Sequence, residues 1–130
     1  MRKKKVVLTG GVFDILHAGH LYTLRQAKKY GDYLVVVVAG DRHIKKKGRK
    51  PIHSQRYRAM MVSELKPVDK VILGGKNPEK IVKKIKPDVI VYGYDQKPFI
   101  KPKGVRIVKL RKYIEKESLK TSKIIKRLGI

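Results

Sequence analysis

The chain of 130 residues contains no cysteine and no tryptophan, and Asn77 is its only asparagine. The absence of cysteine excludes disulfide bonds and thiolate metal sites. No apolar run approaches the roughly 20 residues that a membrane-spanning helix needs, and the apolar part of the basic N-terminus is too short for a secretory signal peptide. We therefore expect a cytoplasmic protein without a membrane span. The scarcity of thermolabile residues beside abundant lysine is typical of thermophile proteins.

Acidic residues are also scarce, because the chain has 10 of them against 34 lysines and arginines, a formal net charge of +24. A field of this sign attracts anions such as nucleotide phosphates, nucleic acid or acidic lipid surfaces. Four of the few carboxylates lie at or beside the end of a predicted strand or in the loop that follows it, where α/β proteins build their sites. These four are Asp14, Asp41, Asp69 and Asp95.

Strand-like and helix-like segments alternate along most of the chain. Short apolar, β-branched runs predict strands at 5–9, 33–39, 68–73, 89–92 and 105–110. Helical spacing and capping residues predict helices at 20–30, 54–65, 78–85 and 121–128. The segment Gly40–Ser54 is predicted to be a loop because Gly48 and Pro51 break regular structure. The alternation predicts a single α/β domain over residues 1–130, a Rossmann-like, doubly wound parallel sheet of about five strands with helices on both faces.

The segment Gly10–His20 has the sequence GGVFDILHAGH and holds two of the four histidines, three residues apart. It joins the first predicted strand to the first predicted helix, where paired glycines and a helix N-terminus favour an anion. A metal site would lack an evident third ligand, so we expect no metal on these histidines, and a dinucleotide site would have the pattern G-x-G-x-x-G. The residues alone favour phosphate binding by His17 and His20, with a purely structural pair as the alternative.

GGVFDILHAGH resembles the G-x-F-D-x-x-H-x-G-H motif of the cytidylyltransferase-like nucleotidyltransferases, and His17–His20 matches its H-x-G-H tetrapeptide. Further matches follow in order: the lysine-rich loop KKKGRKP, a helix with Arg58, a G-x-D turn at Gly93–Asp95, and Leu119–Ile124 at the family's I-S-T-S/T-x-I segment. The resemblance implies the HIGH-type nucleotidyltransferase fold. It also implies a Mg²⁺-assisted reaction in which a phosphorylated small-molecule acceptor attacks the α-phosphorus of ATP or CTP and releases pyrophosphate.

The resemblance further implies roles for individual residues. His17 and His20 would contact the triphosphate as catalytic residues, together with Lys46 and Arg58. The nucleotide-binding residues would be Gly10, Gly11, Val12, Phe13, Asp14, Gly19, Gly93, Asp95, Thr121 and Ser122. The acceptor or a phosphate would meet Lys45, Lys47 and Asp41. A homodimer is the assembly that the family implies.

The base and the acceptor are less determined by these motifs. KGRKP followed by the arginine-bearing helix is most similar to archaeal FAD synthases, which transfer AMP from ATP to FMN. The tail is more similar to glycerol-3-phosphate or phosphoethanolamine cytidylyltransferases, but the arginine of their R-T-E-G stretch is missing from Glu115–Ser118, which weakens a preference for CTP. Adenylyl transfer to FMN is the main hypothesis and cytidylyl transfer the alternative.

A basic nucleic-acid-binding module is an alternative from another class, motivated by the charge of +24. Such a module would gather its basic residues on one face and interleave aromatic residues with them. Here the basic residues are spread through every predicted element, so we expect only non-specific, salt-sensitive binding of nucleic acid.

Overall fold

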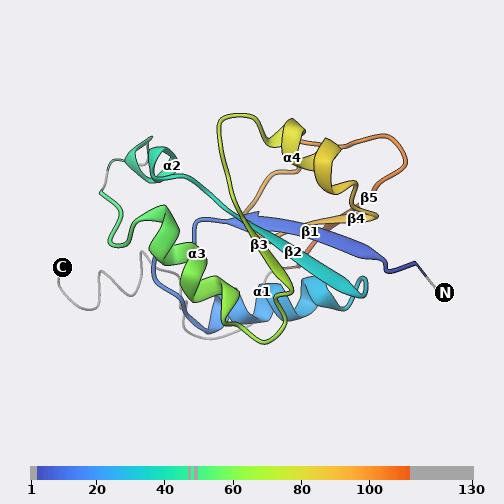
Figure 1. The fold of residues 1–130 in the computed structure, drawn as a ribbon, viewed down its shortest axis with the longest axis horizontal. Helices are drawn as coiled ribbons and strands as arrows, with labels where there is room; N and C mark the ends of the chain where they lie inside the picture. Colours follow the sequence, from blue (N-terminus) through green and yellow to red (C-terminus); the bar gives the residue numbers. More distant parts are fainter. Residues whose placement is uncertain (1–2, 47, 49, 112–130) are drawn as a thin grey trace.

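A computed structural model describes residues 3–46, 48 and 50–111 (Figure 1). Its strands are β1 (Val6–Gly11), β2 (Tyr33–Val38), β3 (Lys70–Leu73), β4 (Val89–Tyr92) and β5 (Arg106–Lys109). Its helices are α1 (Ala18–Lys28), α2 (Asp41–Lys46), α3 (Gln55–Ser63) and α4 (Pro78–Ile85). The helix predicted at 121–128 lies outside the described residues, as do Lys47, Thr121 and Ser122.

The strands form one parallel sheet in the order β3-β2-β1-β4-β5. From β1 the chain adds β2 and β3 on one side, then crosses over and adds β4 and β5 on the other, so the strand order reverses between β1 and β4. In open parallel sheets, ligands bind outside the carboxyl ends of the strands at such a reversal. The predicted doubly wound fold is confirmed, and the site is expected where β1 and β4 end.

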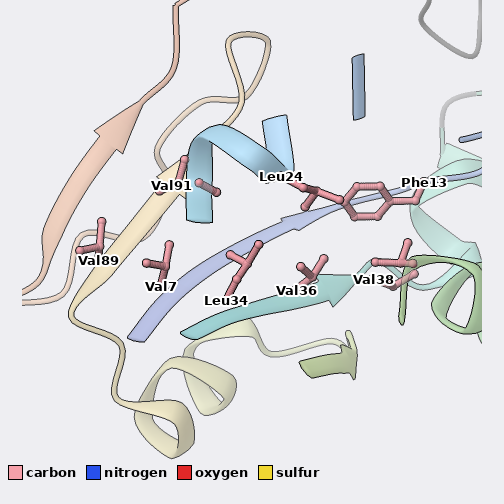
Figure 2. Close-up of a cluster of buried hydrophobic side chains, with 10 residues drawn as sticks. Val7, Phe13, Leu24, Leu34, Val36, Val38, Val89 and Val91 are labelled. Atoms are coloured by element: carbon pink, nitrogen blue, oxygen red, sulfur yellow. The ribbon is translucent and has the colours of Figure 1, made fainter. Parts of the chain in front are cut away.

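Helices cover both faces of the sheet, with α1 and α3 on one face and α4 on the other (Figure 1). The sequence of strand β2 explains this arrangement, because its unbroken apolar run supplies buried side chains to both faces of the sheet. Leu34 and Val36 pack with Leu24 of α1, and Figure 2 shows them on the same side of the sheet. Val35 instead packs with Val82 of α4. A strand buried on both faces has a continuous apolar sequence rather than an alternating one.

Helix α2 corrects the prediction that Gly40–Ser54 is entirely a loop. The helix has only six residues, and its local sequence is not strongly helical. Tertiary contacts stabilise it: Ile44 is fully buried, and Asp41 in its first turn forms an ion pair with Arg58 of α3. Such long-range contacts override local propensity, which is why the pattern along the sequence missed this turn.

The layer between α1 and the sheet is expected to carry much of the stability. Leu24 is fully buried there, so Leu24→Ala should lower the free energy of unfolding by about 3 kcal/mol, through lost burial and the cavity that remains. Leu73→Ala is the matched control, because Leu73 is 46% exposed and should change stability by less than about 1 kcal/mol. Urea unfolding of the two variants measures the difference, and equal losses would contradict this description of the core.

Candidate active site

The segment Gly10–His20 turns sharply after β1, at Phe13, whose φ is 54°. This left-handed backbone conformation costs a non-glycine residue about 1–2 kcal/mol. Burial of the Phe13 ring in the core beside Leu24 holds the turn in place (Figure 2). A Cβ on Gly11 would lie 2.9 Å from the ring, so only glycine fits there. Phe13, predicted to bind nucleotide, therefore contributes its ring to the core and its backbone to the turn.

The two histidines form the start of α1. His17 is the N-cap, and its Nδ1 accepts a hydrogen bond from the Gly19 N–H at 3.1 Å. The Nδ1 of His20 accepts in turn from the His17 N–H at 3.2 Å. Because both Nδ1 atoms are acceptors, each neutral ring carries its proton on Nε2. The ring centroids lie 3.9 Å apart, so the two imidazoles lie on the same side of the helix start.

Glycine at position 19 is required by the same geometry. A Cβ there would lie 2.8 Å from Cε1 of His17 and 2.9 Å from its Nδ1. Any larger residue would push the imidazole away from the helix end. The H-x-G-H tetrapeptide is therefore a capping arrangement that fixes both rings at the positive end of the helix dipole.

Burial and, to a smaller extent, the charge of a protonated His17 lower the pKa of His20 from its ordinary value of 6.5 to about 4. Asp95 acts in the opposite direction, which places this carboxylate within electrostatic range of His20. The turn after β4 and the histidine motif are thus brought together at the strand-order reversal. At neutral pH, His20 is an uncharged imidazole that can donate through Nε2–H.

Asp14 joins the motif to the segment before α3. Its carboxylate is buried and accepts hydrogen bonds from the backbone N–H groups of Ile52 and His53, each at 3.0 Å. The Ile52 N–H also donates to the second carboxylate oxygen at 3.1 Å. In this structure the carboxylate of Asp14 serves to hold two segments together.

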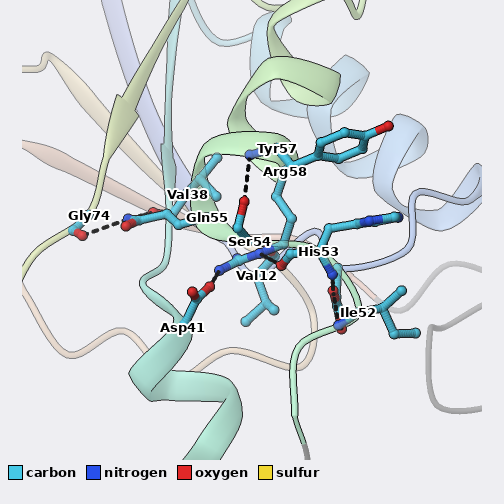
Figure 3. A network of polar contacts seen from close by, with 11 residues as sticks. Val12, Val38, Asp41, Ile52, His53, Ser54, Gln55, Tyr57, Arg58 and Gly74 are labelled. Atoms are coloured by element: carbon cyan, nitrogen blue, oxygen red, sulfur yellow. Dashed lines mark hydrogen bonds and ion pairs between the residues drawn. The ribbon is translucent and has the colours of Figure 1, made fainter.

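Arg58 lies at the centre of a polar network and is fully buried (Figure 3). Its Nε donates to the His53 carbonyl at 3.0 Å, and its two terminal nitrogens donate to the Val12 carbonyl and to Oδ1 of Asp41, both at 2.6 Å. The sequence predicted phosphate or acceptor binding for Arg58 and Asp41. In this structure the two side chains bind each other, and the guanidinium holds the motif through the Val12 carbonyl. Contact of either side chain with a substrate stays a prediction.

Two glutamines that the sequence did not single out tie the strand ends together. The Nε2 of Gln96 donates to the Gly10 carbonyl at 3.0 Å, and its Oε1 accepts from the Gly93 N–H at 2.7 Å, so this side chain joins β1 to the turn after β4. Gln55 donates to the carbonyls of Val38 and Gly74 at 3.0 and 2.8 Å, joining β2 to β3 (Figure 3). Neither a single glutamine at the start of a helix, such as Gln55, nor one in a loop, such as Gln96, has a sequence pattern that would have revealed this.

The remaining predicted residues divide into three groups. Lys45 is exposed on α2, and Lys46 is the last residue of that helix. Lys47, Thr121 and Ser122 lie outside the described residues. The expectation that Asp69 lies near the site, like the other scarce acids, is wrong. Asp69 precedes β3, forms an ion pair with Lys28 and accepts a hydrogen bond from the Leu34 N–H. It therefore lies at the amino edge of the sheet, away from the site.

A cavity of about 590 Å³ opens between the sheet and α4, on the face opposite to α1. Gly10, Gly11 and Val12 of the motif form part of its wall, so the cavity and the histidine pair share one stretch of backbone. Within the part of the chain that the structure describes, no three histidine or acidic side chains gather as metal ligands. The described helices include none long and apolar enough to cross a membrane.

The model of the "Cytidylyltransferase-like" family matches residues 8–127. This match spans nearly the whole chain and includes the histidine motif and both strand ends of the site. The chain belongs to the cytidylyltransferase-like family. It is therefore a nucleotidyltransferase, and the resemblance inferred from the motif is confirmed.

Relatives of this cytidylyltransferase-like chain include FAD synthases from three archaea. The FAD synthase of Thermococcus sibiricus is 43% identical, over 98% of this chain and 95% of its own length. Those of Aciduliprofundum boonei and Thermoplasma acidophilum are each 45% identical, over 92% and 95% of this chain and 87% and 96% of their own lengths.

Solved structures show the same fold. A Thermoplasma volcanium structure titled as a lipopolysaccharide core biosynthesis protein is 41% identical and has a TM-score of 0.77, over 86% of this chain and all of the other. A protein of unknown function from Archaeoglobus fulgidus is 21% identical with a TM-score of 0.62, over 82% of this chain and 88% of its own, and supports the fold alone.

The network around Arg58 predicts that this residue acts on the site through the fold. Arg58→Lys cannot reach all three acceptors, so it should lower the free energy of unfolding by about 2 kcal/mol and reduce nucleotidyl transfer with it. Arg56→Lys is the matched control on the exposed side of α3 and should change neither. Thermal unfolding and pyrophosphate release measure both effects. Lost turnover with unchanged stability in Arg58→Lys would instead indicate direct contact with substrate.

The lowered pKa of His20 predicts a pH dependence of stability. Between pH 6.5 and about 4 the unfolded chain binds a proton at His20 that the folded protein does not. The free energy of unfolding should therefore be highest above pH 6.5 and fall as the pH drops through this window. His20→Asn should lose less stability than the wild type between pH 7 and pH 5 in urea unfolding. Equal losses in the two proteins would contradict the lowered pKa.

Proposed function

We propose that this nucleotidyltransferase transfers AMP from ATP to FMN and forms FAD and pyrophosphate. The observation that carries the proposal is the pair of imidazoles at the N-terminus of α1, beside Gly10 and Gly11 at the strand-order reversal. Three FAD synthases that are 43–45% identical over nearly the whole chain support this choice of base and acceptor.

The reaction needs positioning and charge stabilisation more than proton transfer. The phosphate of FMN is already anionic, so it attacks the α-phosphorus of ATP in line without a general base. His17 and His20 donate through Nε2–H to oxygens of the α-phosphate and the leaving pyrophosphate. The end of α1 adds its partial positive charge. The negative charge of the incoming phosphates raises the pKa of His20, but the ring donates as a neutral imidazole, because protonation would place a hydrogen on the Nδ1 that accepts from the His17 N–H.

In this proposal His17, His20, Gly10 and Gly11 form the triphosphate site, called here the histidine cradle, and other residues complete it. Lys45, Lys46 or Lys47 reaches the triphosphate from the side opposite to the histidines, and Thr121 and Ser122 supply hydroxyl and amide donors. Gly93 and Asp95 border the nucleotide. Arg58, Asp41 and Asp14 act as positioning residues, which hold the histidine-bearing turn against α2 and α3.

The expected Mg²⁺ fits the site as a companion of the triphosphate. The described residues offer no cluster of three histidine or acidic side chains, whereas phosphate oxygens are ligands that Mg²⁺ prefers. When bound, the ion neutralises charge that builds up on the leaving pyrophosphate. A homodimer, which the family implies, belongs to this proposal as well.

Substitution of the histidines tests the mechanism. His17→Ala and His20→Ala should each lower kcat by about 10²–10³-fold, because each removes a donor to charge that develops in the transition state. His53→Ala is the matched control, since its ring stacks on Tyr57 outside the motif. Pyrophosphate release measures the rates. Wild-type turnover in both motif variants would show that the proposed histidine cradle is wrong. If the variants lose turnover but still bind nucleic acid as the wild type does at matched salt, the hypothesis of a basic nucleic-acid-binding module is also set aside.

A substrate matrix tests the base and the acceptor. ATP and CTP are each combined with FMN, glycerol 3-phosphate, phosphoethanolamine and a sugar 1-phosphate, with pyrophosphate followed in every pair. We expect ATP with FMN to exceed every other pair by at least about 10²-fold in kcat/KM, the scale at which a built site rejects a mismatched substrate. Preferred turnover of CTP with either small acceptor would establish the cytidylyl alternative instead.

A further inference from the structure

The cavity beneath α4 is much less polar than the histidine cradle next to it. Leu8 and Ile90 rise from the sheet, and Ile81 and Val82 descend from α4 to form its walls. The polar side chains among its lining residues are Thr9, Gln96, Lys76, Lys97 and Tyr92, whose hydroxyl is bonded to the backbone of Ile100. The Thr9 hydroxyl already donates to the Val91 carbonyl at 2.7 Å, and both lysines are exposed at the rim.

One wall of the cavity carries an exposed aromatic residue on a pinned loop. Phe99 is 72% exposed, although it borders the cavity. Gln96 fixes the start of the loop through its contacts with Gly10 and Gly93. The Tyr92 hydroxyl fixes its end, donating to the Ile100 carbonyl at 2.8 Å and accepting from the Ile100 N–H at 3.1 Å. The ring of Phe99 is thus held at the rim, edge-on to Tyr92 at 5.9 Å between centroids.

The size and chemistry of the cavity indicate which of the reaction's ligands it can bind. Its volume of about 590 Å³ is that of a pocket for a large organic ligand. Glycerol phosphate and phosphoethanolamine are small and polar, and their hydroxyl or ammonium groups would find few partners on aliphatic walls. Adenine presents an amino group and ring nitrogens around most of its edge, which also call for polar partners. The isoalloxazine ring of a flavin is larger, and its dimethylbenzene edge needs no hydrogen bond.

We propose that this cavity seats the isoalloxazine ring of FMN, with the aromatic ring of Phe99 covering one face of the flavin. The inference rests on the proposed function. The dimethylbenzene edge lies among the aliphatic side chains, and the polar edge lies toward the exposed ammonium groups of Lys76 and Lys97. The ribityl phosphate then passes over Gly10 and Gly11, the backbone that the cavity shares with the histidine cradle. The attacking phosphate thereby reaches the α-phosphorus of ATP.

Two variants alter the cavity while sparing the fold. Phe99→Ala removes an exposed ring, and Gly75→Leu adds bulk where a new Cβ meets no atom within 4 Å and the backbone is not left-handed. Met60→Ala is the control, because Met60 is 54% exposed on α3 and does not line the cavity. Flavin fluorescence titrations with FMN and with riboflavin measure binding without turnover. Steady-state kinetics measure KM for FMN and for ATP separately.

We expect each cavity variant to weaken FMN binding about tenfold, through lost stacking or blocked volume. Binding of riboflavin should weaken by the same factor, because riboflavin has the ring but no phosphate. The KM for ATP should change less than about twofold in the cavity variants, and Met60→Ala should change flavin binding and both KM values by less than about twofold. An increased KM for ATP alone would place adenine in the cavity and overturn the proposal, as would unaltered flavin binding by both variants. Wild-type protein that binds FMN through this cavity but forms no FAD would overturn the proposed function and leave the flavin site standing.

Discussion

The buried guanidinium of Arg58 is the constraint on which the site depends. It is fully buried and directs hydrogen bonds to three parts of the chain: the turn after β1, the segment before α3, and the start of α2. A charge buried in this way is stable only while its partners stay in place. The turn that it grips contains the left-handed Phe13, and the histidines follow from it. Fold stability and site geometry are therefore coupled through one side chain.

The sheet separates two kinds of recognition and joins them at one stretch of backbone. On the α1 side, a helix end and two imidazoles suit the charge of a triphosphate. On the α4 side, aliphatic walls suit an apolar ring. Gly10 and Gly11 lie between the two, at the reversal of strand order, where an acceptor phosphate can meet the α-phosphorus. The net charge of +24 draws anionic substrates toward the molecule but does not discriminate among them.

The sequence predicted the fold well, because local patterns determine most of it. The continuous apolar run 33–39 predicted a strand buried on both faces, and the motif at Gly10–His20 predicted a turn between the first strand and the first helix; both are present in the structure. The patterns could not show how Arg58 is used, since an arginine on a helix has the same pattern whether it faces a phosphate or three buried acceptors. They missed α2, Gln55 and Gln96 for the same reason: each is determined by contacts between segments far apart in the sequence. The cavity is likewise a property of the assembled sheet and α4.

The central claim is that His17 and His20 bind the triphosphate, and the chain's four histidines make it directly measurable. In protein with ¹⁵N-labelled histidine, imidazole resonances are recorded by NMR as a non-hydrolysable ATP analogue is added with Mg²⁺. We predict large shifts for Nε2 of His17 and His20 and a rise in the pKa of His20 from about 4, with small shifts for His43 and His53. Saturable binding that shifts His43 or His53 and leaves the motif pair unchanged would contradict the account.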